Sequence, residues 1–305
     1  MKRGGVLLQG RIVKAKGGFY FVYDLQGESL CCRARGRFKE AGIDLMVGDL
    51  VEVNTEKKVI EQVYSRENRL LRPPVANIDQ VVVLMSVRRP PLDLFFLDRL
   101  LVSVEASFLD AVICFNKMDL AEAEDEKRIK EVREVLLDCG YQIILSSAVT
   151  GYGIEELRSY LQGKTTVLAG PSGTGKSTLL NKLKPELALL SGAVSAKTER
   201  GRHTTRHVEL LELEQNTFVA DAPGFQRLDL RGVTSAELDA FFPEMASREP
   251  CRFNSCLHSR EPGCAVKEAV QNGAIAAWRY EHYLAFLKEI QQREKTFFHK
   301  KGEDR

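Results

Sequence analysis

The sequence predicts an α/β protein in three parts: a five-stranded β-barrel, a mostly parallel β-sheet with helices on both faces, and a mainly helical segment that holds a metal ion. Three observations support this fold class. Short strand-like runs follow one another near the amino terminus, strand-like and helix-like runs alternate in the middle, and three cysteines and one histidine cluster near the end. We expect the domains to span residues 1–72, 73–232 and 233–305.

The composition is that of a chain with real hydrophobic cores. Of its 305 residues, 44% are hydrophobic and 28% are charged, which suits two or three domains. The longest apolar runs have only the length of a strand, so we expect no signal peptide, no membrane span and a cytoplasmic location. Seven cysteines without a secretory signal favour a reducing compartment, where closely spaced cysteines indicate a metal more often than a disulfide.

The first domain is expected to be a small closed barrel of the oligonucleotide-binding (OB) kind. Five runs alternate apolar and polar residues, at 7–15, 18–24, 29–36, 47–54 and 57–64. Residues 1–72 carry 14 Lys and Arg against 9 Asp and Glu, an excess larger than the net +2 of the whole chain. This bias fits a polyanionic partner or a solvated basic face equally well.

Two interpretations of the barrel stay open. It could bind RNA through basic and aromatic side chains that contact phosphates and stack on bases, or it could merely pack on the rest of the protein. The side chains that would serve the first interpretation are Arg33, Arg35, Arg37, Lys39, Phe19, Tyr20 and Phe21.

Beyond a linker predicted at Arg72-Pro73-Pro74, strands and helices alternate. Strands are expected at 81–85, 111–115, 142–145, 165–169 and 217–220, and helices at 95–106, 124–137 and 153–161. This alternation predicts a mostly parallel sheet, and ligands bind such sheets at the carboxyl ends of the strands.

Residues 170–177, Gly-Pro-Ser-Gly-Thr-Gly-Lys-Ser, form a phosphate-loop pattern between a predicted strand and an apolar helical run. Backbone N–H groups of the loop would hold the β-phosphate, Lys176 would contact the β- and γ-oxygens, and Ser177 would bind Mg²⁺. The residues that we expect to contact the nucleotide here are Gly170, Pro171, Ser172, Gly173, Thr174, Gly175, Lys176, Ser177 and Thr178.

Two further motifs, Asn-Lys-Met-Asp at 116–119 and Ser147-Ala148, each follow a predicted strand and indicate guanine. The Asp119 carboxylate can accept from guanine N1–H and the 2-amino group, which adenine does not offer. Asn116 can bond the opposite edge, Lys117 can lie along the base, and the Ala148 N–H can meet O6. Charge-assisted hydrogen bonds contribute ~1.5–3 kcal/mol each, so we expect GTP rather than ATP.

Residues 191–206 are rich in Gly, Ser, Lys and Arg, as expected of a segment that responds to the γ-phosphate. Thr204 or Thr205 should reach Mg²⁺, and Thr205 is preferred. The strand at 217–220 delivers Asp221, the carboxylate on the Mg²⁺ side, and the Gly224 N–H can meet the γ-phosphate.

Hydrolysis requires a positioned water molecule, and the usual residue for this task is absent. Phe225 stands where a water-orienting Gln is common. His203 is the nearest candidate for that role, with an ordinary structural histidine as the alternative.

The order of the motifs predicts a circularly permuted GTPase. The guanine motifs precede the phosphate loop in this chain, whereas an ordinary GTPase has the phosphate loop first. Permutation is compatible with the fold because the ends of a compact domain usually lie close together at the surface. The segment after 221–224 is therefore attached directly to a nucleotide-responsive loop.

Cys251, Cys256, His258 and Cys264 predict a closed, tetrahedral, structural zinc site, with buried free thiols as the alternative. A capping-box pattern at Thr234 and Glu237 and helical periodicity over 274–290 predict helices around this site.

Together these residues resemble the circularly permuted GTPases that depend on the small ribosomal subunit and assist its late maturation. The resemblance covers nearly the whole chain, including Gly201-Arg202-His203-Thr204-Thr205 and the Cys-x4-Cys-x-His-x5-Cys pattern. It implies a cytoplasmic enzyme with slow intrinsic GTP hydrolysis that small-subunit RNA stimulates, and we expect the protein to be a monomer. The barrel and the zinc domain would hold ribosomal RNA while hydrolysis times release.

Two other functions stay open from the sequence. One is a GTP-dependent RNA-binding switch that acts on tRNA or another RNA. The other is an ATP-driven transport or repair protein that shares only the phosphate loop.

Overall fold

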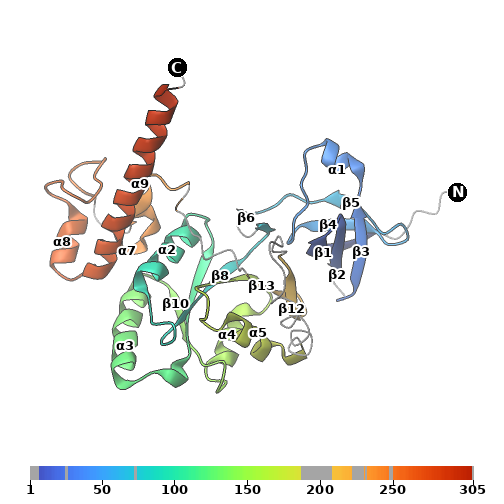
Figure 1. The fold of residues 1–305 in the computed structure, drawn as a ribbon, viewed down its shortest axis with the longest axis horizontal. Coiled ribbons are helices and arrows are strands. Elements are labelled where there is room, and N and C mark those ends of the chain that lie inside the picture. The colour runs from blue at the N-terminus through green and yellow to red at the C-terminus, as the bar shows by residue number, and fades with distance from the viewer. Residues whose placement is uncertain are drawn as a thin grey trace.

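The computed structural model describes residues 7–24, 27–71, 74–186, 208–221, 230, 232–246 and 250–303. Figure 1 shows a barrel in blue, a central α/β part in cyan to yellow, and a helical part in orange and red. Within the described residues, no helix combines the length and the apolar character needed to cross a membrane.

Five strands close the predicted barrel. They are β1 (Leu7–Lys16), β2 (Phe19–Asp24), β3 (Ser29–Ala34), β4 (Leu50–Asn54) and β5 (Val59–Val63), in the order β1-β2-β3-β5-β4. Strand β1 pairs with both β2 and β4, which closes the sheet on itself. The interior is apolar and consists of Ile12, Val22, Cys32, Phe38, Val51, Val53 and Ile60. The five-stranded barrel predicted from alternation is confirmed.

Two details of the barrel differ from the sequence prediction. Gly36 does not end a strand but begins a short helix, α1 (Gly36–Glu40), which buries Phe38 in the barrel. Strand β4 begins at Leu50 rather than at residue 47, because the residues before it form a turn in which Asp49 Oδ2 accepts a hydrogen bond from the Met46 N–H at 2.8 Å.

Arg72 and Pro73 of the predicted linker lie outside the described residues, and a short strand lies on each side of them. Strand β6 (Arg69–Leu71) pairs with β7 (Pro74–Ala76), so Pro74 is the first residue of a strand, a position where proline is tolerated. Val75 is fully buried and belongs to the same apolar cluster as Val13 and Val47 of the barrel and residues of the central sheet. The barrel therefore packs on the central domain through a continuous apolar contact.

The central sheet has six strands in the order β10-β9-β8-β11-β13-β12. Its strands are β8 (Gln80–Ser86), β9 (Asp110–Asn116), β10 (Gln142–Leu145), β11 (Thr165–Ala169), β12 (Leu210–Glu214) and β13 (Thr217–Asp221). All neighbours are parallel except β12 and β13. The mostly parallel sheet is confirmed, and the antiparallel edge strand β12 was not predicted.

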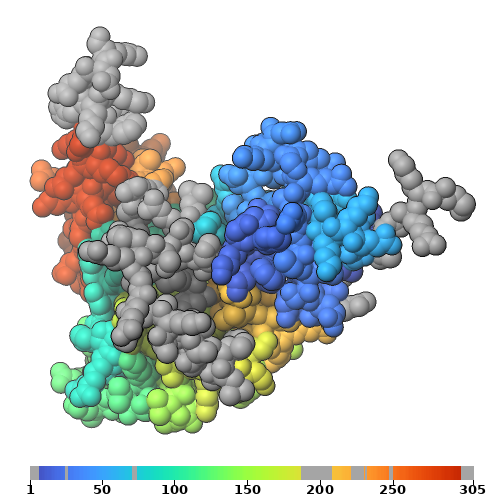
Figure 2. All heavy atoms as spheres, turned by 45° about the vertical axis from the view of Figure 1, so that its right-hand side comes forward, coloured from blue at the N-terminus to red at the C-terminus, as the bar shows by residue number. Residues whose placement is uncertain are grey.

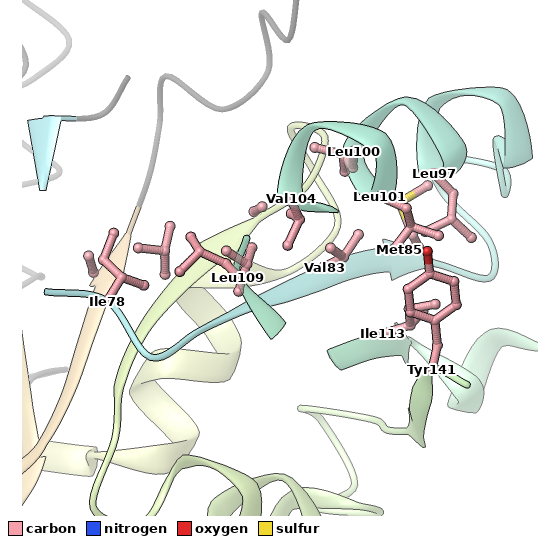
Figure 3. Packing of buried hydrophobic residues seen from close by; sticks show 14 of the residues in the cluster. Ile78, Val83, Met85, Leu97, Leu100, Leu101, Val104, Leu109, Ile113 and Tyr141 are labelled. Atoms are coloured by element: carbon pink, nitrogen blue, oxygen red, sulfur yellow. The ribbon is translucent and has the colours of Figure 1, made fainter. Parts of the chain in front are cut away.

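Helices cover both faces of this sheet. The helices α2 (Leu94–Glu105) and α3 (Ala123–Asp138) lie on one face, and α4 (Ile154–Leu161) and α5 (Lys176–Leu183) on the other. Figure 3 shows Leu97 and Leu101 of α2 packed over Val83 and Met85 of β8. Alternate residues of β8 belong to the two separate clusters, so the strand is buried on both faces.

The last part of the chain is mainly helical. It contains the 3₁₀-helix η2 (Leu238–Phe241), α7 (Pro243–Ala246), α8 (Ala265–Gln271) and the long α9 (Ala277–Glu303), which extends away from the body in Figure 1. One contact of the predicted capping box is present, because Glu237 Oε2 accepts from the Thr234 N–H at 3.4 Å, and the same oxygen accepts from Thr234 Oγ1 at 2.6 Å. Helices follow it as predicted, and an extended Phe242 (φ −119°, ψ 94°) separates η2 from α7, because the following Pro243 favours that conformation.

A cluster of buried charged side chains joins the helical part to α2 of the central domain. Arg279 of α9 donates to both carboxylate oxygens of Glu244, at 2.7 and 2.8 Å, and also to Asp98 of α2. His282 Nδ1 lies 2.7 Å from the other oxygen of Asp98. Because Arg279 and Asp98 are 1% and 0% exposed, these charges depend on one another for solvation.

Candidate functional site

The nucleotide motifs meet at one edge of the sheet although their order along the chain is reversed. Strand β9 ends at Asn116, β10 ends just before residues 146–148, β11 ends just before the phosphate loop, and β13 ends at Asp221. These strands run parallel, so their carboxyl ends share an edge. The guanine motifs and the phosphate loop are in direct contact, because Asn116 bonds the carbonyl oxygen of Thr174.

The phosphate loop requires glycine where it passes close to other backbone or side-chain atoms. Gly170 has φ 146°, and a Cβ there would lie 2.1 Å from the carbonyl oxygen of Leu84. Gly175 has φ 98°, and a Cβ there would lie 2.5 Å from Asn116 Nδ2. Any larger residue would push the loop off the sheet edge and away from Asn116.

The helix α5 begins at the end of this loop. Lys176 is buried, and its Nζ donates to the carbonyl oxygens of Gly170 and Pro171, both at 2.8 Å. Ser177 and Thr178, in the first turn, are exposed. The unpaired N–H groups and the dipole of a helix amino terminus favour a phosphate at this position.

Asn116 is the residue that joins the three motifs. Its Nδ2 donates to the carbonyl oxygen of Thr174 at 2.9 Å, and its Oδ1 accepts from the Ala148 N–H and from Ser146 Oγ, each at 3.2 Å. Asn116 is 1% exposed. In the structure both ends of its amide therefore contact protein, and a bond from Asn116 to the base stays a prediction.

Lys117 and Asp119 present their functional groups beside this junction. Lys117 has a left-handed backbone (φ 66°), and its Nζ donates to the carbonyl oxygens of Gly173, at 2.5 Å, and of Arg89. Asp119 lies in the 3₁₀-helix η1 (Met118–Leu120) and is exposed. Its Oδ1 accepts from Ser147 Oγ at 2.5 Å, which fixes the orientation of the carboxylate.

The sequence did not predict a pair of ion pairs that holds the loop after the Asn-Lys-Met-Asp motif in place. Arg88, in the loop between β8 and α2, forms ion pairs with Glu122 and with Asp125, the latter at 3.2 Å. Glu122 and Asp125 form the capping box at the start of α3, directly after η1. No local sequence pattern predicts this contact, because only the fold brings Arg88 near these two carboxylates.

Several predicted site residues lie outside the described part of the chain. They are His203, Thr204, Thr205 and Gly224, together with the side chain of Asp221, whose backbone ends β13. Their proposed contacts with Mg²⁺, the γ-phosphate and water stay predictions.

The structure brings the four predicted metal ligands together in a second site. The ligand atoms of Cys251, Cys256, His258 and Cys264 all lie within 4.8 Å of one another. Tetrahedral zinc requires about 3.8 Å between two sulfurs and about 3.6 Å between sulfur and nitrogen. The sulfurs of Cys251 and Cys264 are 3.8 Å apart, and His258 Nδ1 lies 3.5 and 3.3 Å from them. This donor set fits zinc.

The histidine of this site is oriented by a residue that the sequence analysis did not select. His258 Nε2 lies 3.2 Å from Asp239 Oδ2, so Nδ1 faces the thiols. The hydrogen bond from His258 lowers the pKa of the Asp239 carboxyl below its ordinary value. A carboxylate behind the distal nitrogen of a histidine is a common outer partner in metal sites. Asp239 lies in η2, and α7 separates it from the cysteines, so the spacing of the ligands gave no signal for it.

The strand order and the shared edge define a P-loop GTPase fold with a circularly permuted chain, as predicted. The chain belongs to the RsgA GTPase family: the model of the RsgA GTPase matches residues 63–231, and that of the RsgA N-terminal domain matches residues 9–59.

Relatives and solved structures are similar over almost their whole length. The small ribosomal subunit biogenesis GTPase RsgA of Moorella thermoacetica is 46% identical, over 95% of this chain and 100% of the relative. The protein of the same name from Bacillus pumilus is 42% identical, over 95% and 99%. YjeQ from Thermotoga maritima superposes with a TM-score of 0.83 at 37% identity, over 94% and 99% of the two chains. YloQ, described as a circularly permuted GTPase, gives 0.80 at 36% identity, over 96% and 98%.

Proposed function

We propose that this protein hydrolyses GTP to GDP and phosphate and acts in the maturation of the small ribosomal subunit. GTP hydrolysis is supported by the hydrogen bonds of Asn116, which connect a guanine motif to the phosphate loop at one edge of the sheet. The role in maturation of the small ribosomal subunit is supported by relatives named small ribosomal subunit biogenesis GTPase that match at 41–46% identity.

The roles that we propose for the nucleotide site follow from the contacts. The carboxylate of Asp119, held by Ser147, accepts from guanine N1–H and the 2-amino group. When nucleotide binds, Lys176 leaves the carbonyl oxygens of Gly170 and Pro171 and donates to β- and γ-phosphate oxygens. Asn116 fixes the position of the base-binding loop relative to the phosphate loop. Gly224 donates its N–H to the γ-phosphate, and His203 positions the attacking water.

Mg²⁺ would be held by Ser177, Thr205 and Asp221 together with phosphate oxygens. Hydroxyl and carboxylate oxygens are the ligands that Mg²⁺ prefers. When bound, the ion neutralises charge that develops on the β- and γ-phosphates during hydrolysis. Ser177 is suitably exposed at the start of α5.

One structural zinc ion would be held by Cys251, Cys256, His258 and Cys264. With four protein ligands the site is closed, so the ion would cross-link the loops between η2 and α8 rather than act on a substrate.

The barrel and the zinc domain are the proposed contacts with ribosomal RNA. The guanidinium carbon of Arg33 lies 4.9 Å from the ring centre of Phe19, which is 40% exposed. Such a pair offers both charge and a stacking face to single-stranded RNA. Arg35 pairs with the Glu61 carboxylate, so its charge is partly neutralised, whereas Arg37 donates to the Glu61 carbonyl oxygen. Because Arg33 combines its charge with the exposed ring of Phe19, it is the predicted barrel residue that we expect to contribute most.

We also propose that the protein acts as a monomer in the cytoplasm, where small subunits mature. Light scattering after size-exclusion chromatography tests the monomer.

The proposed function is tested by co-sedimentation with purified small subunits in the presence of a non-hydrolysable GTP analogue, GDP or an ATP analogue. Strong association with the GTP analogue and weak association with GDP or the ATP analogue is expected. Nucleotide-independent association, or equal retention on tRNA-coated beads, would contradict a switch specific for the small subunit.

A further inference from the structure

A cleft with a volume of about 630 Å³ lies between the barrel and the central sheet. Gly10, Arg11 and Tyr23 of the barrel line one side, and Thr165 and Phe218, near the starts of β11 and β13, line the other. Figure 2 shows the blue barrel directly against the gold segment 208–221. The cleft thus belongs to both domains.

This cleft is separate from the nucleotide site. It opens at the amino ends of β11 and β13, whereas the phosphate loop follows the carboxyl end of β11. Five residues of strand span about 15 Å, so a ligand in one site does not touch the other.

Arg11 gives the cleft a cation that can bind a ligand. Its Nη1 donates to the carbonyl oxygen of Asn77 at 3.1 Å, and its guanidinium carbon lies 5.5 Å from the ring centre of Phe218. Within the described part of the chain, Arg11 makes no ion pair. Burial lowers the pKa of Arg11, against the attraction of Asp79 and Glu67. A guanidinium has five N–H donors, so several remain for acceptors on a ligand.

The other walls favour a planar ligand with donors of its own. Phe218 is buried and meets the Tyr23 ring edge to face, with centroids 6.4 Å apart. Asp24 and Asp79 line the same cleft. Asp79 Oδ2 accepts from the Thr165 N–H at 2.6 Å, which fixes this carboxylate at the cleft wall. Two carboxylates oppose a simple anion but accept from N–H groups.

We propose that this cleft is a second base-binding site, which takes an unstacked guanine from RNA or from a free nucleotide. Guanine O6 and N7 can accept both arms of the Arg11 guanidinium, and its N1–H and 2-amino group can donate to a carboxylate. Adenine places a donor at position 6, where it would oppose Arg11. Pyrimidines lack N7 and so lose the paired contact.

The test uses the full-length protein with its nucleotide site saturated by GDP, so the result does not depend on GTP hydrolysis. Binding of the RNA pentamers AAGAA and AAAAA is measured by fluorescence anisotropy, and binding of free guanosine and adenosine by calorimetry. Arg11→Lys keeps the charge but loses the paired donors. Lys57→Ala, in an exposed turn of the barrel, is the control for general charge effects.

Wild type and Lys57→Ala are expected to prefer the guanine ligand by about tenfold or more, and Arg11→Lys to lose that preference while binding GDP normally. If only AAGAA binds more tightly than its AAAAA counterpart, the natural ligand is a guanine in RNA. If guanosine also binds more tightly than adenosine, the natural ligand is a free nucleotide. In AAGAA with 6-thioguanosine at the central position, ultraviolet cross-links should map to Tyr23, Tyr64 or Phe218, the aromatic residues that line the cleft. Equal binding of guanine and adenine ligands by wild type, or cross-links confined to other peptides, would overturn the proposal.

Discussion

The buried ionic cluster at Arg279 makes a quantitative prediction about the attachment of the helical domain. Arg279→Met keeps most of the side-chain volume but leaves Asp98 and Glu244 buried without their shared cation. Removing one partner of a buried ion pair costs about 3–5 kcal/mol, a large part of the ~5–15 kcal/mol that stabilises a domain. At an m-value of about 2 kcal/mol/M in urea, the unfolding midpoint should fall by roughly 1.5–2.5 M.

The assay uses a reporter that the chain provides. Trp278 is the single tryptophan and directly precedes Arg279, so its fluorescence follows unfolding of this part. Arg260→Ala removes an exposed arginine that makes no ion pair among the described residues, and it should change stability by at most about 0.5 kcal/mol. A loss below about 1 kcal/mol for Arg279→Met would refute the reasoning.

The pH dependence of the same variant has a defined sign. Burial is the largest influence on Glu244 and raises its pKa, but the hydrogen bond and charge of Arg279 bring this pKa below the ordinary 4.5. A lowered carboxyl pKa stabilises the folded state above 4.5 and loses that contribution as the pH falls. Without Arg279, burial should raise the pKa of Glu244, so the contribution of this carboxyl to folding stability should increase as the pH falls toward 4.5. The same pH dependence in both proteins would contradict this assignment.

Three further predictions concern the two sites. Asp119→Asn exchanges an acceptor for a donor and should weaken GTP binding by up to ~10⁴-fold in favour of xanthosine triphosphate, and equal GTP affinity in calorimetry would exclude the assignment. Lys176→Ala should abolish hydrolysis, whereas His203→Ala should slow subunit-stimulated turnover and spare GTP binding; unchanged stimulated turnover would remove His203 from the mechanism. Cys256→Ala should lose zinc, measured by mass spectrometry, and unfold the segment after residue 232 with the GTPase core intact, while Asp239→Asn should weaken zinc affinity 10–100-fold in chelator competition; full zinc retention in both would contradict the site.

Local patterns predicted most of the architecture because they act over a few residues. Alternation in the barrel gave strands within three residues of their ends, and the apolar runs 81–85 and 165–169 gave β8 and β11 to within one residue. Short elements were harder to predict: α1 has five residues, and β12 lies next to a segment that reads as a loop. Phe242 shows how one proline divides a helical region into two short helices, η2 and α7.

The residues of the candidate sites also fall into two groups, those that local sequence patterns predicted and those that they did not. Motif residues such as Asn116 and Lys176 were found because their spacing is fixed by the ligand. Arg88, Asp239 and Arg279 were not found, because their partners lie 19 to 181 residues away and only the fold brings them together. For Asn116 the structure adds a contact that the motif alone did not show, its bond to Thr174.

The central claim is that this chain is a GTPase whose site is completed by the small ribosomal subunit. The most direct measurement is the steady-state rate of phosphate release from GTP with and without purified small subunits, with Lys176→Ala as the blank and tRNA as the control RNA. Because no Gln stands at Phe225 to orient water, the protein alone should turn over at ~10⁻⁴ to 10⁻² per second. A clear increase with small subunits, and none with tRNA or with ATP as substrate, is the predicted result; an unchanged rate in the presence of small subunits would contradict the account.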